Sequence, residues 1–156
     1  MYTVIGPYTD DPGARQIDIR IDKHDTWSMD HTLALIIVPM LKQLHVTKQG
    51  APLVDDEDVP EHLRSTAAPP LENEWDIDDN HFKRWDWVMD EMIWAMEQIV
   101  QDNDDEFYDH SEVDNTADLN TQLQQMKVDR EGLQRYHDRI QNGCRLFGRY
   151  FQNLWD

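Results

Sequence analysis

The sequence predicts a mainly α fold of three long packed helices, with a short N-terminal β-hairpin and two long acidic loops. Three observations support this fold class. Apolar residues recur at helical spacing in three long segments. Near the N-terminus, isoleucines alternate with charged residues, as in a strand. Two further segments carry most of the carboxylates. At 156 residues the chain is expected to form a single domain, residues 1–156.

The hairpin is predicted from residues 16–22, where isoleucine alternates with aspartate or arginine. This period of two is typical of a half-buried strand. Because one strand is not stable alone, residues 2–5 are its expected partner. A flap over the helices is one role for such a hairpin.

The first helix is expected to begin after Thr26 or Ser28, either of which can cap it, and to run to about Val46. One of its faces is apolar throughout: Leu33, Ile36, Ile37, Met40, Leu41 and Leu44. Leu35 lies on the opposite side with Val38, so the helix is apolar nearly all round. That pattern predicts a central helix. Pro39 should kink it.

The second helix is predicted for residues 80–101. Its apolar stripe consists of Phe82, Trp85, Met89, Met92, Ile93, Met96 and Val100. At about 100° per residue, Trp87 and Trp94 point roughly 170° away from the centre of this stripe. Large aromatic side chains on a charged face require a second partner, which is either another protein layer or a ligand.

The last helix is predicted for residues 129–154. Its expected core face is Leu133, Tyr136, Ile140, Cys144, Phe147, Phe151 and Leu154. Arg135, Arg139, Arg145 and Arg149 gather on the opposite side, as a natural counterweight to the acidic loops. Gly143 and Gly148 would be tolerated in a helix if another element approaches closely there. Cys144 on the core face is expected to be an inert buried thiol.

The net charge of −18 is concentrated in the middle of the chain. Residues 1–50 carry six acids and five bases, residues 129–156 carry four acids and five bases, and residues 51–128 carry 22 acids and four bases. The acidic loops are expected at residues 47–79 and 102–118 and should be solvated or disordered. One helical turn is expected in the first loop, after Pro60.

This charge distribution argues against general nucleic-acid binding, which needs a basic face. It permits binding to basic proteins or cations, or imitation of a nucleic acid. The absence of a secretory signal, of a membrane-length apolar run and of a second cysteine favours a soluble protein of a reducing cytoplasm.

Three stretches resemble a family of small, acidic, uncharacterised proteins of tailed bacteriophages: HDTWSMDHTLALIIVPMLKQL (24–44), FKRWDWVMDEMIWAMEQ (82–98) and RIQNGCRLFGRYFQNLWD (139–156). The resemblance implies a phage accessory protein made in the cytoplasm of an infected bacterial host. It implies no particular activity.

Two sets of residues are candidates for a site, and no catalytic residue is predicted. The first would bind a planar base carrying phosphate between indoles and cationic side chains: Trp87, Trp94, His31, Lys42, Arg139, Asn142 and Arg145. The second could hold a divalent cation on one helical face: Asp86, Asp90 and Glu97. No other cofactor is expected.

Three classes of function stay open, and an enzyme is the least favoured. The first is a non-enzymatic binder that sequesters a nucleotide-like host signal or occupies a host protein. The second is an acidic decoy that mimics DNA. The third is a metal-dependent phosphohydrolase that uses neighbouring His–Asp pairs: His24–Asp25, Asp30–His31, Asp109–His110 and His137–Asp138. A homo-oligomer, for example through the tryptophan face, is also possible.

Overall fold

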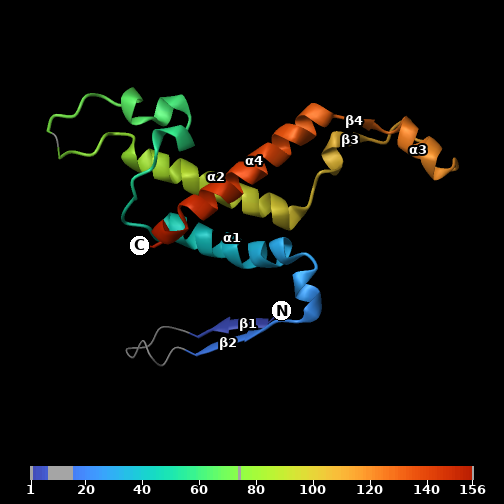
Figure 1. The fold of residues 1–156 in the computed structure, drawn as a ribbon, viewed down its shortest axis with the longest axis horizontal. Coiled ribbons are helices and arrows are strands. Elements are labelled where there is room, and N and C mark those ends of the chain that lie inside the picture. Colours follow the sequence, from blue (N-terminus) through green and yellow to red (C-terminus); the bar gives the residue numbers. More distant parts are fainter. Residues whose placement is uncertain (1, 7–15, 74, 156) are drawn as a thin grey trace.

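The computed structural model describes residues 2–6, 16–73 and 75–155. The helices are α1 (Met29–Thr47), α2 (His81–Gln101), α3 (Leu119–Gln125) and α4 (Arg130–Arg149). The strands are β1 (Tyr2–Ile5), β2 (Ile17–Arg20), β3 (Tyr108–Asp109) and β4 (Lys127–Val128). Figure 1 shows α1, α2 and α4 packed together, with the hairpin to one side and α3 beyond one end. The mainly α fold with an N-terminal hairpin is therefore confirmed.

The hairpin pairs β1 with β2 antiparallel, from Tyr2 opposite Arg20 to Ile5 opposite Ile17. Its isoleucines are not buried against the helices, because Ile17 is 62% exposed and Ile19 is 54% exposed. The hairpin therefore projects beside α1 rather than covering the helical body (Figure 1). Its expected role as a flap is not what the structure shows.

The central helix is α2, which contacts both α1 and α4. Ten of its residues are buried, among them Trp85, Val88, Met89 and Met92, whereas α1 buries only Ala34 and Leu41. The prediction of a central first helix is therefore wrong. Since α4 packs on α2 and not on the far side of α1, apolar residues of α1 such as Met40 stay exposed.

Helix α4 is rotated from its predicted orientation. Its buried residues are Gly132, Gly143 and Leu146, followed by Tyr150 just after the helix. At about 100° per residue these positions lie about a quarter-turn from the predicted core face. A Cβ on Gly143 would overlap the Ala95 side chain and lie 2.7 Å from the Glu91 carbonyl oxygen, so α2 and α4 are in backbone contact there. Around Gly148 there is open space, and the expected close approach is absent.

The acidic segment between α1 and α2 is ordered by 3₁₀ turns at Asp56–Asp58, Glu61–Leu63 and Ser65–Ala67. The turn expected after Pro60 is confirmed. Two ion-pair clusters attach the segment to the helices, so it is not a solvated loop throughout.

The first cluster joins Asp58, whose side chain is 1% exposed, to the end of α4. The Arg145 guanidinium donates to Asp58 at 2.7 Å, and the Tyr150 hydroxyl donates to it at 2.6 Å. Arg149 pairs with Asp58 at 2.9 Å and also with Asp55. Burial and the Asp58 hydrogen bond raise the pKa of Tyr150 to about 12.

The second cluster joins Asp78 to Arg84 of α2 through two hydrogen bonds of 2.8 and 2.7 Å. Arg84 also donates to the carbonyl oxygen of Leu63 at 3.2 Å. The hydrogen bond from Arg84 holds the pKa of Asp78 below its usual value.

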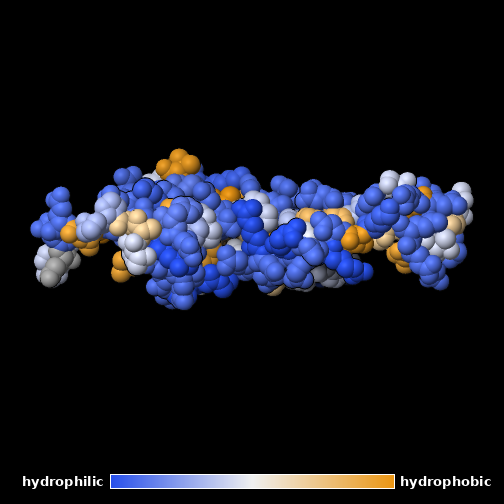
Figure 2. Space-filling view, turned by 90° about the horizontal axis from the view of Figure 1, so that it is seen from above, coloured by the Kyte–Doolittle hydropathy of each residue, from blue (hydrophilic) through white to orange (hydrophobic). Residues whose placement is uncertain are grey.

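Residues 102–128 form an arm beyond the ends of α2 and α4. It contains α3, whose N-terminus is capped by the Asp118 carboxylate, and the short β3–β4 pair. The face shown in Figure 2 is mostly hydrophilic, with separate hydrophobic patches. Across the described residues, no helix has the length and apolar character needed to cross a membrane.

Candidate functional site

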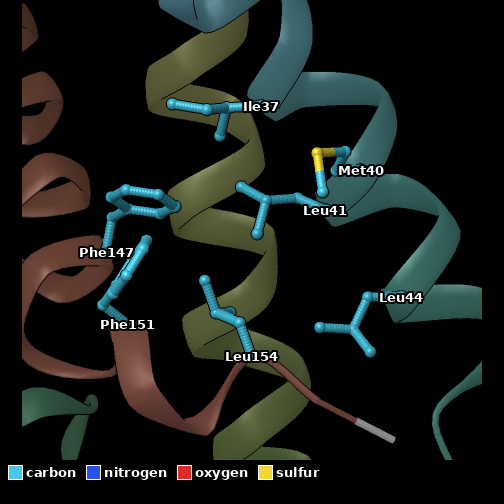
Figure 3. Close-up of a pocket in the computed structure, with 7 residues that line it drawn as sticks. All are labelled: Ile37, Met40, Leu41, Leu44, Phe147, Phe151 and Leu154. Atoms are coloured by element: carbon cyan, nitrogen blue, oxygen red, sulfur yellow. The ribbon is translucent and has the colours of Figure 1, made fainter. Parts of the chain in front are cut away.

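The main candidate site is an apolar groove between α1 and the C-terminal end of α4, with a volume of about 530 Å³. It is lined by Ile37, Met40, Leu41, Leu44, Phe147, Phe151 and Leu154 (Figure 3). Figure 3 shows the residues of α1 facing the phenylalanines, while α2 passes behind them. None of these seven side chains can ionise, so the groove offers contact area and shape rather than acid–base chemistry.

The rotation of α4 creates this groove. The predicted core face of α4 includes Phe147 and Phe151, but the helix turns Gly143 and Leu146 into α2 instead. The apolar face is thereby left half covered, and it meets the similarly half-covered face of α1. Met40 is 62% exposed and Phe151 is 60% exposed.

No protein family, curated protein or solved structure matches this chain.

Trp94 is half-buried beneath α4. The guanidinium carbon of Arg139 lies 3.8 Å from the centre of its ring, and Tyr136 meets the ring edge-on at 5.8 Å. Arg139 also donates two hydrogen bonds to Glu91, at 3.0 and 2.7 Å, which raise the pKa of the guanidinium. Helix α4 thus supplies a second protein layer over this indole.

The other members of the predicted ligand site are dispersed. Trp87 is half-buried and packs against the hydrophobic core, and His31 is half-buried on α1. Lys42 pairs with Glu97 at 2.5 Å. Arg145 donates to the Asn142 side-chain oxygen at 3.1 and 2.9 Å.

The structure therefore brings Trp94 to Arg139 and Asn142 to Arg145, but it does not assemble the seven predicted residues. None of the seven lines the α1–α4 groove or three smaller cavities along the described residues. A nucleotide-binding role for the tryptophan face stays a prediction.

The predicted cation ligands on α2 each contact a basic side chain of α1 or of Lys48, the residue that follows it. Asp86 pairs with Lys48 at 2.6 Å, and His45 lies 3.6 Å from Asp86 and 3.8 Å from Asp90. Glu97 pairs with Lys42. These contacts join α1 to α2, and within the described ranges no group of three or more His, Cys, Asp or Glu side chains is arranged to hold a metal ion.

Two other features singled out in the sequence, a His–Asp pair and Cys144, lie outside the set of residues that line the groove. His24 contacts Asp22 at 2.8 Å. Cys144 is half-buried and packs against the core, and burial raises the pKa of its thiol. A thiol with a raised pKa is a poor nucleophile, as expected for a structural cysteine.

Sequence reasoning missed the groove because it assigned Phe147, Phe151 and Leu154 to the core. It did identify the arginine stripe as the counterweight to the acidic loops, and this is confirmed for Arg145 and Arg149. The sequence predicted a close approach at both Gly143 and Gly148, and the structure has it at Gly143 alone of these two, so the glycines did not reveal the rotation of α4.

Proposed function

We propose that this chain is a non-enzymatic bacteriophage accessory protein that holds an amphipathic helix of a host protein in the α1–α4 groove. The proposed setting is the cytoplasm of the infected cell, which the resemblance of its helical segments to phage proteins supports. The single observation that carries the proposal is an open apolar groove between α1 and the end of α4 with the 3₁₀ turn (Phe151–Asn153) that follows it.

Both walls suit a helical occupant. On α1, Ile37, Met40 and Leu44 are three and four residues apart, and the other wall continues from Phe147 through Phe151 to Leu154 at similar spacing. Two such ridges can pack against a third helix laid between them, which is the helix-in-groove mode of recognition. An exposed apolar patch of this kind marks an interaction site.

The net charge of the protein indicates which residues the occupant should carry on the face that points away from the groove. The groove itself is uncharged, but the chain has a net charge of −18. A helix with one apolar stripe and a basic opposite face would be attracted by this field and then bury its stripe in the groove. The proposed partner segment is therefore a basic amphipathic helix.

The alternatives have less geometric support. A nucleotide between the indoles would need cationic side chains, but Arg139 and Lys42 are already paired with Glu91 and Glu97. A DNA-mimicking decoy would need a rigid array of outward-facing carboxylates. The exposed carboxylates of residues 102–118 lie mostly on turns and irregular segments, and Asp58 and Asp78 are paired inside the protein.

Photo-crosslinking from α1 tests the proposal. Benzoylphenylalanine placed at Met40, inside the groove, should capture a host protein from a lysate, whereas the same group at Val46 should not. Val46 is the matched control because it lies on α1 and is 83% exposed, but it does not line the groove. Mass spectrometry of the adduct then identifies the captured segment.

The captured segment is next synthesised as a peptide and its Kd is measured. Met40→Asp should weaken binding about tenfold or more, because a charge would enter an apolar contact. Val46→Asp should leave the Kd unchanged. Equal crosslinking from both positions, or a Kd that is insensitive to Met40→Asp, would contradict the groove as the binding site.

A further inference from the structure

Strand β2 has an outer edge without a strand partner among the described residues, because its sheet contains β1 and β2 alone. The N–H of Gly6 donates to the carbonyl oxygen of Gln16 at 2.8 Å, which makes these two residues a hydrogen-bonded pair. Hydrogen-bonded and non-bonded pairs alternate along an antiparallel ladder. Residues 18 and 20 therefore direct their backbone groups to β1, and residues 17, 19 and 21 direct theirs outward.

This edge is also apolar on one face. Ile5 is opposite Ile17, and Thr3 is opposite Ile19, so these side chains share a face of the hairpin. Alternation adds Ile21, which is 58% exposed. An isolated two-stranded hairpin is marginally stable at best, whereas more strands and a covered apolar face stabilise it. An open edge of this kind is a template for pairing with another strand.

We infer that β2 pairs antiparallel with β2 of a second copy of this chain, about a twofold axis at Ile19. The sequence of residues 17–21, Ile-Asp-Ile-Arg-Ile, is complementary to itself in this register. Asp18 of each copy lies opposite Arg20 of the other. Ile17 of each copy lies opposite Ile21 of the other, and the two Ile19 residues meet at the axis.

The alternation of hydrogen-bonded and non-bonded pairs in the hairpin fits the same register. The outward backbone groups at residues 17, 19 and 21 form the bonded pairs of the new ladder. Asp18 and Arg20 then occupy its non-bonded pairs, in which opposite side chains are closest. Within one chain, Arg20 contacts Asp18 at 3.3 Å, and an ion pair of this kind near the surface contributes little to stability.

A second copy is also the partner that the charge distribution favours. Most of the protein would repel its own copy, because residues 51–128 carry 22 acids and four bases. Residues 1–50 carry six acids and five bases and are nearly neutral. In Figure 1, β2 is the strand farther from α1, so its outer edge faces away from the helices.

Sedimentation velocity of the full chain tests the pairing. The wild type should approach twice the monomer mass of 18.6 kDa as its concentration rises. Asp18→Arg and Arg20→Asp should each weaken self-association about tenfold or more, because each places like charges opposite one another twice. A mixture of the two variants should form a heterodimer, because every opposed pair is then complementary. The double variant that exchanges both residues should dimerise again.

Arg135→Asp is the control for net charge, because this exposed arginine lies on α4, away from the hairpin, and pairs weakly with Glu131 at 3.9 Å. It should associate like the wild type. A wild type that stays monomeric up to about 1 mM, where even a weak contact is populated, would overturn the proposal. So would single variants that self-associate unchanged, or single variants that fail to pair when mixed while the wild type is dimeric.

Discussion

At the scale of single residues, Gly143 decides how α4 sits. The absence of a side chain lets the two helix backbones approach, with Ala95 and the carbonyl group of Glu91 in the space that a Cβ would take. The next glycine of the helix, Gly148, has open space around it and an ordinary helical backbone. The two glycines therefore have different roles on the same helix.

Alanine substitutions should separate these roles. Gly143→Ala should lower the free energy of unfolding by about 1–3 kcal/mol, because the added methyl group overpacks the contact with α2. Gly148→Ala should raise it by up to about 1 kcal/mol, because alanine is the better helix former. Urea denaturation measures both. Changes of the same sign in the two variants would contradict the assigned contact.

The surroundings of Trp94 were predictable from the sequence only in part. The position of Trp94 opposite the apolar stripe of its helix predicted a second partner, either a protein layer or a ligand, and α4 supplies a protein layer. The sequence placed Arg139 and Trp94 in one predicted ligand site, but it could not show that the guanidinium lies on the ring itself. The ion pair with Glu91, which helps to hold Arg139 there, joins two different helices.

At the scale of elements, the acidic segment between α1 and α2 behaves as a strap attached at two points. One attachment is the buried pair of Asp78 and Arg84, whose side chains are 15% and 5% exposed. The other is Asp58 at the end of α4. The strap needs its carboxylates ionised, so its attachment depends on pH.

The Asp78→Asn variant should reveal this pH dependence. The pKa of Asp78 is lower in the folded protein than its usual value of 3.8, so its ionised form stabilises the fold above about pH 4. At neutral pH the variant should be less stable than the wild type by about 1–3 kcal/mol. As the pH falls through the folded-state pKa, the difference should shrink.

Denaturant titrations over this pH range measure the difference between the two proteins. Asp76→Asn is a suitable control, because Asp76 is an exposed neighbour that accepts hydrogen bonds from Asn73 and, among the described residues, pairs with no arginine or lysine. A gap between Asp78→Asn and wild type that widens on acidification would contradict the role given to the pair.

The elements themselves were predictable because each depends on local periodicity. Helical spacing identified α1, α2 and α4, and the alternation around Ile19 identified the hairpin. Their arrangement was not predictable in the same way. The rotation of α4 depends on one glycine and on ion pairs with distant residues, and the choice of α2 as the central helix depends on that rotation. The groove follows from the rotation of α4 and from the central position of α2, so no local sequence pattern predicted it.

At the scale of the whole molecule, electrostatic repulsion opposes the fold. The segment from 102 to 118 carries eight acids and no base. A net charge far from zero destabilises a compact state through self-repulsion. The ion pairs around Asp58 are partly buried, because the carboxylate is enclosed while the arginines are partly exposed, and such pairs are screened by salt less than surface charges.

Salt should therefore stabilise the protein. Raising the salt concentration from about 0.01 M to about 1 M shortens the screening length from about 30 Å to about 3 Å, which weakens the repulsion between exposed carboxylates. The Tm measured by calorimetry should rise. A Tm that falls would mean that the ion pairs between α1 and α2 outweigh the repulsion.

The contact between Asp58 and Tyr150 joins residues 92 positions apart. During synthesis on a ribosome, this carboxylate therefore lacks its tyrosine donor until Tyr150 has been made and has left the exit tunnel. Nascent α1 and the strap would remain open to chaperones and proteases until then, and the native topology would close only once the end of α4 is released.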